Sequence, residues 1–354
     1  MPKIPNRDQL AWQLAHPGDN LGPGIIAASA VSSVLAVIFV VCRIWSKRIL
    51  YGRFHLETND WLCSLGCLSL IAEAALFIVA TRYGLGRHTA FVENPRILQI
   101  LILTAENLYA LEIALVKLSI LNLYQQLFRQ SLWFYRATWL VAAAVIALAL
   151  WVILGSDLQC VPIAATWDPT VHANCINYGL SALLSYVVNI IIDVVILAMP
   201  IPMVMKLQVS HHRKWMLILT FATGGSACIV SIVQLRYIPN LGSTSDPSWD
   251  TGPISIISLF EVAIGILAVS IPTYRPLYQY LTRGDVPTQI GGDRVVNSYA
   301  KNTYTAQVSV NSNFFSSTAS EAQPHGIIAT DQIELVRHVK KGGTWVQVDD
   351  ASLQ

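Results

Sequence analysis

Seven long apolar stretches constrain what this chain can fold into more than any other feature of its sequence. Each has roughly the length that a helix needs to cross the hydrocarbon core of a bilayer. The stretches cover residues 24–45, 61–81, 97–123, 137–154, 178–203, 215–236 and 253–271. Transmembrane strands fit poorly, because they are shorter segments of alternating polarity. The sequence therefore predicts an all-α, multi-pass membrane protein with seven transmembrane helices.

The overall composition agrees with a chain that is solvated mainly by lipid. Of its 354 residues, 54% are hydrophobic and only 12% are charged, whereas an ordinary soluble domain carries about 25% charged residues. The formal net charge is +2, and no basic block suggests binding to nucleic acid. The first 20 residues are polar and contain Pro and Gly. They therefore do not resemble a cleavable signal peptide, and we expect the first apolar stretch to act as both signal and anchor.

Lysine and arginine residues in the connecting loops predict the orientation in the membrane. The first, third and fifth loops hold eight of them: Lys47, Arg48, Arg53, Arg129, Arg136, Lys206, Arg213 and Lys214. The N-terminal tail and second loop hold five: Lys3, Arg7, Arg82, Arg87 and Arg96. The C-terminal tail adds seven to the first group. This bias predicts an external N-terminus and a cytosolic C-terminus, although the second loop opposes it. The plasma membrane is favoured over an internal membrane.

The regions outside the seven-helix domain (24–272) differ from it in composition. Residues 1–23 are expected to form an external tail. In residues 273–283, apolar side chains recur at helical spacing, which predicts an amphipathic helix on the inner membrane face; a structured linker is the alternative. Residues 284–354 are rich in Ser, Thr, Asn, Gln and Gly. They cannot bury enough apolar surface to offset the cost of ordering, so they are predicted to be a disordered cytosolic tail.

Charged residues inside the apolar stretches are the first candidates for a functional site. They are Glu73, Glu106, Glu112, Lys117, Asp193, Arg236 and Glu261. A charge within the bilayer is costly, so each is expected to face the bundle interior with a partner. We expect Lys117 to pair with Asp193 or Glu112, and Arg236 to pair with Glu261. Such pairs either line a polar cavity or only fix the packing of the helices.

Two cysteines fall in the fourth loop, which the predicted topology places outside the cell. Disulfides persist in oxidising compartments, so a bridge between Cys160 and Cys175 is the first interpretation, and two unpaired thiols are the alternative. The same external loops contain His88, Asp168 and His172. Their spacing does not indicate a metal site, and we predict none.

The fifth loop is basic and is predicted to be cytosolic. Its Lys206, Arg213 and Lys214 are expected to contact anionic lipid or a cytosolic partner. Lipid contact is the simpler interpretation.

An ordered set of short motifs resembles the fungal rhodopsin-domain family, over about residues 25–280. The matching residues are Asp60, Gly84 to His88, Lys117 to Leu121, Tyr124, Cys160, Pro162, Trp167, Asp168, Cys175, Asp193, Pro200 to Pro202, Arg236, Asp246 to Trp249, Glu261 and Pro272. The resemblance implies a GPCR-like seven-helix membrane protein of a filamentous fungus. Some members are receptor-like, and others are encoded in secondary-metabolite clusters such as that for satratoxin. Because residues 253–271 contain no lysine, no retinal is expected and no other cofactor is predicted.

Three functions remain open after this comparison. The first is a receptor-like sensor of an external small molecule or surface cue, with cytosolic signalling partners at loops three and five and at the tail. The second is a membrane-embedded enzyme or accessory protein of mycotoxin biosynthesis, in which buried carboxylates act as general acids. The third is a transporter, which the odd helix count disfavours. We rank them in this order, and no catalytic residue is assigned.

Overall fold

The computed structural model describes residues 7–16, 18–51, 56–127, 132–166, 171, 173–202, 211–238, 246–283, 338–341 and 344–347. The chain divides into two units, residues 1–289 and 290–354. In the second unit, β3 (His338–Lys341) pairs with β4 (Thr344–Gln347) as an antiparallel ladder, which the sequence analysis did not predict. The other residues of the tail that is predicted to be disordered lie outside the described ones.

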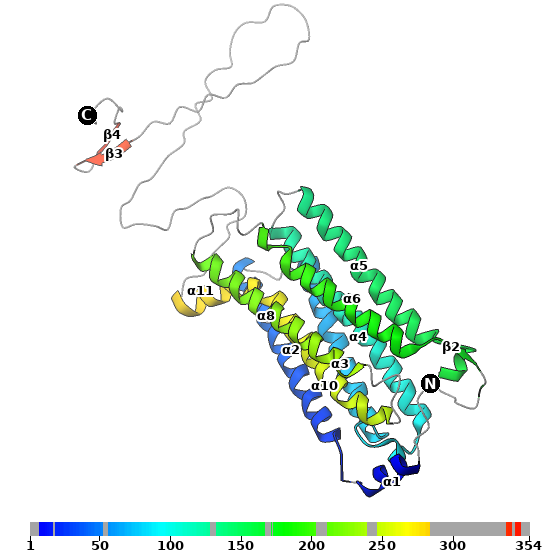
Figure 1. Ribbon diagram of the computed structural model, residues 1–354. Helices are drawn as coiled ribbons and strands as arrows, with labels where there is room; N and C mark the ends of the chain where they lie inside the picture. The colour runs from blue at the N-terminus through cyan, green and yellow to red at the C-terminus, as the bar shows by residue number, and fades with distance from the viewer. Residues whose placement is uncertain are drawn as a thin grey trace, which may run out of the picture. The chain divides into compact units, whose positions relative to one another are not determined.

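The first unit is a bundle of long helices that run side by side (Figure 1). They are α2 (Gly22–Tyr51), α3 (Thr58–Arg82), α4 (Pro95–Leu127), α5 (Leu132–Asp157), α6 (Tyr178–Ala198), α8 (His211–Leu235) and α10 (Pro247–Ser270). Within the described residues, six of them are long and apolar enough to cross a membrane: α2, α3, α4, α5, α6 and α10. In α8, the described apolar part is shorter and runs from Ala222 to Leu235.

These helices contain nearly all of the predicted apolar ranges, and most extend beyond them by several residues. A helix keeps satisfying its own backbone hydrogen bonds outside the hydrocarbon core, so its ends are not set by the apolar stretch. The fifth range differs, because α6 ends at Ala198 and the predicted range continues to residue 203. The two prolines at 200 and 202 follow that end, and proline does not continue a helix.

Short elements close the two ends of the bundle. At one end lie α1 (Arg7–Ala15), η1 (Thr89–Phe91), β1 (Cys160–Val161), η2 (Ile163–Thr166) and β2 (Asn174–Cys175); at the other lie η3 (Ile271–Tyr274) and α11 (Arg275–Arg283). The helix α1 was not predicted within the N-terminal tail. The predicted amphipathic helix is present as η3 and α11. Its contact with the membrane stays a prediction.

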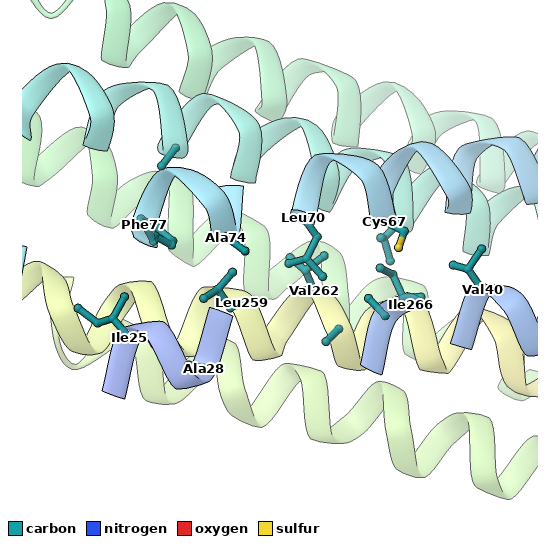
Figure 2. Close-up of a cluster of buried hydrophobic side chains, with 14 of the residues drawn as sticks. Ile25, Ala28, Val40, Cys67, Leu70, Ala74, Phe77, Leu259, Val262 and Ile266 are labelled. Atoms are coloured by element: carbon teal, nitrogen blue, oxygen red, sulfur yellow. The ribbon is translucent and has the colours of Figure 1, made fainter. Parts of the chain in front are cut away.

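A cluster of buried hydrophobic side chains lies between α2, α3 and α10 (Figure 2). Leu70 of α3, Val262 and Leu259 of α10 and Ile25 of α2 meet there, and each is fully buried. By contrast, α5 exposes large apolar side chains such as Leu140 along its length. Apolar side chains facing outward are expected where the surrounding solvent is lipid.

Small residues allow α4 to approach its neighbours closely. Gly66 of α3 and Gly265 of α10 both face Val116 of α4. A Cβ atom would lie 3.3 Å from this valine at position 66 and 2.9 Å from it at position 265. Close contact through small residues is how membrane helices commonly pack, because no hydrophobic effect drives them together in lipid.

The turn after α3 fixes the start of two other helices. Gly84 and Gly86 have φ angles of 109° and 82°, which favour glycine. The backbone N–H of Gly86 donates to the carbonyl of Ser248 at 3.1 Å, and its carbonyl accepts from Leu21 N–H at 2.9 Å. The tight turn that begins at Gly84 therefore ties the beginnings of α2 and α10 together.

A disulfide joins Cys160 to Cys175, as predicted. The two cysteines face each other in the antiparallel pair of β1 and β2. The bridge connects the end of α5 to the beginning of α6. We call this end of the bundle the disulfide end.

Candidate ligand cavity and buried polar contacts

A cavity of about 80 Å³ lies between α4, α5 and α6. A single water needs only about 10–15 Å³ on a comparable measure, so the space exceeds one water. Its apolar walls are formed by Ala110, Ile113, Ala114, Val145, Leu148, Ala149 and Val152. Its polar lining includes Glu106, Tyr109, Lys117, Ser156, Tyr178, Ser181, Ser185, Tyr186 and Asn189. Two of the predicted site residues, Glu106 and Lys117, therefore line one cavity.

Near the disulfide, Glu106 lines the cavity, and Asp157 lies next to the lining residue Ser156 without lining the cavity itself. The hydroxyl of Tyr178 donates to the carboxylate of Glu106. Asp157, the last residue of α5, accepts a hydrogen bond of 2.9 Å from the side chain of Asn107. Asn107 in turn accepts from the hydroxyl of Ser156 at 3.1 Å. Because Tyr178 is the first residue of α6, the disulfide holds both helix ends beside this polar group.

Two stacked tyrosines connect the cavity to the rest of the bundle. The rings of Tyr109 and Tyr186 have centroids 6.5 Å apart and are nearly parallel. The hydroxyl of Tyr109 donates to Glu261 of α10 at 2.6 Å. Gln234 of α8 donates to the hydroxyl of Tyr186 at 3.3 Å. The cavity wall is thus hydrogen-bonded to two helices that do not line the cavity.

Lys117 lies farther from the disulfide and forms one of the predicted ion pairs. Its ammonium group is 2.8 Å from the carboxylate of Asp193. It also donates to the side-chain oxygen of Asn189 at 2.6 Å and to the backbone oxygen of Asn189 at 3.3 Å. The alternative pairing with Glu112 is not formed. The same lysine lines a second cavity of about 70 Å³, which α4, α6, α8 and α10 surround.

The predicted pair between Arg236 and Glu261 is wrong. Glu261 instead accepts hydrogen bonds from Tyr109 at 2.6 Å and from Ser231 at 2.5 Å. Ser231 and Arg236 come from the same part of the chain, but they are five residues apart, which is about 7.5 Å along a helix. Arg236 lies just beyond the end of α8, and Ser231 lies at the depth of Glu261. The sequence places Ser231 and Arg236 in the same apolar range, but it does not show which of the two lies level with Glu261.

Glu73 and Glu112 are the most deeply buried acids of the predicted set, with 1% and 0% exposure. They are neighbours across the contact between α3 and α4. Within the described part of the chain, no lysine, arginine or amide group donates to either carboxyl group, and each acid is a polar neighbour of the other. A buried charge without a partner is very costly. Both acids therefore face the bundle interior, as expected, but the neighbour of each is another acid rather than a cation.

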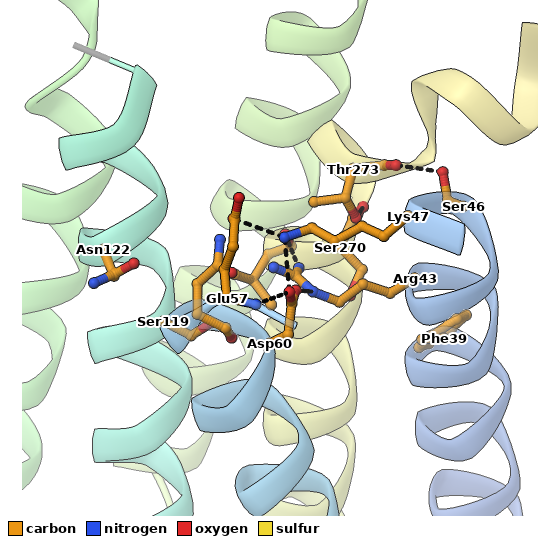
Figure 3. Close-up of polar contacts among 12 residues, drawn as sticks. Phe39, Arg43, Ser46, Lys47, Glu57, Asp60, Ser119, Asn122, Ser270 and Thr273 are labelled. Carbon is orange, nitrogen blue, oxygen red and sulfur yellow. Dashed lines mark hydrogen bonds and ion pairs between the residues drawn. The ribbon is translucent and has the colours of Figure 1, made fainter. Parts of the chain in front are cut away.

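At the end of the bundle opposite the disulfide, four charged residues form a network that the sequence analysis missed (Figure 3). Asp60 accepts from Arg43 and from Lys47, each at 2.7 Å. Lys47 also contacts Glu57 at 2.7 Å. Arg43 further donates to the backbone oxygen of Val269 on α10 at 2.7 Å. This network joins α2, α3 and α10.

A signal for this network was present in the sequence. Arg43 and Lys47 are four residues apart and therefore share one face of a helix. The apolar range ends at residue 45, so hydropathy alone places Lys47 in a loop. In the structure α2 continues to Tyr51, and Lys47 is buried.

Two of the family motifs meet at the disulfide end: His88 of the first contacts Asp246 and Trp249 of the second. The ring nitrogen Nδ1 of His88 is 2.5 Å from the carboxylate of Asp246. Its ring stacks on Trp249 at a centroid distance of 4.7 Å and meets the edge of Trp12 of α1 at 5.3 Å. The N-terminal helix is therefore packed against the turn after α3.

Some predicted contacts fall where the structure gives no side-chain description. Lys206 lies outside the described residues. Arg213 and Lys214 belong to α8, but their side chains are not described. Their proposed contact with lipid or a partner stays a prediction. Among the described residues, no group of three or more His, Cys, Asp or Glu is placed to hold a metal ion.

These features together define a multi-pass helical membrane protein with a cavity inside its bundle. The family model of the fungal rhodopsin domain matches residues 42–280, about two thirds of the sequence. The chain therefore belongs to the fungal rhodopsin domain family, as its motifs indicated.

Three curated relatives show how varied the family is. A "SAT4 family membrane protein" of Emericella nidulans is 27% identical, covering 73% of this chain and 67% of the relative. "Satratoxin biosynthesis SC1 cluster protein 4" of Stachybotrys chartarum is 23% identical, covering 51% and 66%. "Receptor GIN3" of Arthrobotrys oligospora is 24% identical, covering 75% and 64%. No solved structure matches the chain significantly.

Proposed function

We propose that this protein is a receptor-like sensor whose ligand is a small molecule bound in the cavity between α4, α5 and α6. The observation that carries the proposal is the connection of this cavity to distant helices. Tyr109 lines the cavity and donates to Glu261 on α10, and Tyr186 lines it and accepts from Gln234 on α8. A ligand that displaces or reorients these rings changes hydrogen bonds on helices that it does not touch.

A ligand shifts a conformational equilibrium only as far as it binds the two states differently. The two tyrosines can supply such a difference in affinity, since the hydroxyls of Tyr109 and Tyr186 can bond either the ligand or their partners Glu261 and Gln234. The ion pair of Lys117 with Asp193 adds a second candidate contact between α4 and α6. Movement of packed helices past each other is a common route for such signals.

The topology that we propose has seven crossings, with α8 as the sixth. It places the N-terminus and the disulfide outside and the C-terminus in the cytosol of the plasma membrane. Two observations support it: the disulfide suits an oxidising compartment, and α8 is 25 residues long and packs on α6 and α10. Epitope tags inserted after residue 170 and at the C-terminus of the full chain test the topology. Antibody access to the first tag in intact cells, and to the second only after permeabilisation, is expected; the reverse pattern would refute it.

The sensor function is tested in a deletion strain complemented with the wild-type chain or with single variants. Cyclic AMP is measured after a panel of external small molecules is added. We expect a response that needs the wild-type chain and is weakened by Tyr109→Phe. Tyr135→Phe is the matched control, because Tyr135 lies on α5 and is half exposed. Responses that are identical in the deletion and wild-type strains would refute the sensor proposal.

A second candidate is an accessory role in secondary metabolism. It is supported by the relative named as a satratoxin biosynthesis cluster protein. Glu73 and Glu112 are buried acids without a described cation partner, and they are the groups to test for this role. This role is tested by comparing the metabolites of the wild-type strain with those of the deletion strain and of a strain that carries Glu112→Gln. A lost product with an accumulated precursor would support this role, and an unchanged profile would remove it.

A further inference from the structure

We propose that the ligand of the α4–α5–α6 cavity is an organic ammonium compound, with its charged nitrogen beside Glu106 and its apolar body between α4 and α5. This inference rests on the proposed sensor function, because it names the chemistry of the molecule that the same cavity binds. Three observations support it: the charge of Glu106, which pairs with no described cation, the tyrosine rings of the cavity wall, and the contacts that already occupy the ammonium group of Lys117.

Glu106 is the acid that lines the cavity at the end nearest the disulfide, and among the described residues no cation pairs with it. Glu106 accepts one hydrogen bond, from the neutral hydroxyl of Tyr178. Asp157 does not line the cavity, but it lies near Glu106 and accepts from neutral Asn107, so it brings no positive charge to this end. Within the described part of the chain, no lysine or arginine forms an ion pair with either acid. A cationic group on the ligand would supply the missing positive charge.

Glu106 is accessible to a ligand. Its side chain lines the cavity and keeps partial exposure, although most of the residue is buried. Among the described residues, Tyr178 is its one hydrogen-bond partner, and a carboxylate can accept up to about four hydrogen bonds. Acceptor positions are therefore left for an ammonium group.

Among the described residues, the cavity has no cation that is available to an anionic ligand. Lys117 is the cation that lines it, and the ammonium group of Lys117 is already bound by the carboxylate of Asp193 and by both oxygens of Asn189. An ammonium has three donors, and three acceptors surround it. An anionic ligand would have to break this arrangement and approach the carboxylates, so the cavity selects against it.

The aromatic lining matches the same ligand class. Tyr109, Tyr178 and Tyr186 all contribute to the wall. A cation held against aromatic rings is attracted by their negative faces, and organic ammonium ligands are often bound in this way. Ala110 and Ala149 leave room on the facing helices for an apolar body.

Matched ligands that differ only in the terminal group test the proposal on the purified full chain in lipid nanodiscs. The panel contains phenylalkyl compounds of two chain lengths, each as the primary amine, the trimethylammonium ion, the alcohol and the carboxylic acid. Binding is measured by the shift in the midpoint of thermal unfolding as the concentration increases. We expect the amines or trimethylammonium ions to stabilise the wild-type chain, with at least tenfold tighter binding than the alcohols and no stabilisation by the acids.

Two substitutions separate a specific site from general partition into the membrane protein. We expect Glu106→Gln to weaken binding of the ammonium members at least tenfold and to leave the alcohols unchanged. Glu93→Gln is the matched control, because Glu93 is an exposed acid of the loop before α4 and does not line the cavity. Should Glu106→Gln fail to fold, Asp157→Asn is measured in its place, with a smaller loss expected in the same direction.

Three results would overturn the ammonium proposal: equal binding of alcohols and ammonium ions, tighter binding of the acids, or ammonium binding that Glu106→Gln does not weaken. Absence of binding by every ammonium member would also overturn it. The sensor function is judged separately, by the cyclic AMP response of the complemented strain. A response to neutral or acidic compounds that depends on Tyr109 would retain the sensor and reject the ammonium ligand.

Discussion

Substitution of Asp60 by asparagine is the sharpest test of how this bundle is held together. Asp60 is 1% exposed and accepts from Arg43, from Lys47 and from the backbone N–H of Glu57 at 2.7, 2.7 and 2.9 Å. Asp60→Asn keeps the shape of the side chain but removes its charge. Arg43, which is 0% exposed, is then left without an anionic partner.

Removing one partner of a buried ion pair costs about 3–5 kcal/mol, because the other charge stays buried and uncompensated. For a domain of about 150–250 residues, which is near the size of the helical bundle, 1 kcal/mol lowers the unfolding midpoint by about 2–4 °C. We therefore expect Asp60→Asn to lower the midpoint by roughly 6–20 °C. The assay is scanning fluorimetry of the purified chain in one detergent, followed through intrinsic tryptophan fluorescence.

A control and a rescue make the result specific. Glu57→Gln removes a charge whose side chain is 28% exposed and contacts only Lys47 among the cations, so we expect a loss within about 1 kcal/mol. The double variant Arg43→Met with Asp60→Leu removes both charges and is expected to be more stable than Asp60→Asn. A midpoint for Asp60→Asn that matches Glu57→Gln would show that the network does not hold α2, α3 and α10 together.

Three further predictions concern other parts of the bundle. Cys160→Ser opens a covalent loop whose cysteines are 15 residues apart, which should cost about 3 kcal/mol; a reductant should then lower the midpoint of the wild-type chain but not of the variant. Gly86→Ala places a Cβ 3.0 Å from the backbone nitrogen of Gly22 at a φ of 82°, so we expect a loss of at least about 1 kcal/mol, and an unchanged midpoint would contradict it. Glu112→Gln removes a buried acid without a described cation partner, so the midpoint should stay the same or rise, and a large drop would show that this carboxyl has a bonding role.

Local features of the sequence determined the class of this protein. The apolar ranges lie on helices because a chain in lipid must satisfy its backbone hydrogen bonds within each segment. The pairing of Cys160 with Cys175 also followed from the sequence, since they are the two cysteines of one short loop. The pair of Lys117 with Asp193 was one of two alternatives that the sequence left open, and the structure forms it.

Helix rotation and relative depth could not be predicted in the same way. Glu261 bonds Tyr109 and Ser231 rather than Arg236, because a shift of about a turn along α8 decides which side chain reaches it. The network around Asp60 depends on α2 continuing past the apolar range, which hydropathy does not report. Periodicity places a residue on a helix, but not against a particular neighbour.

The sequence by itself thus determined a family, a set of membrane helices and the charged residues within them. Only the tertiary structure decided which of those residues share a site. It placed Glu106 and Lys117 in one cavity and set Glu73 and Glu112 beside each other with no described cation paired to either. The physical reason is that apolar length is a property of each segment, whereas a cavity and its polar lining arise only from how three or more helices pack against one another.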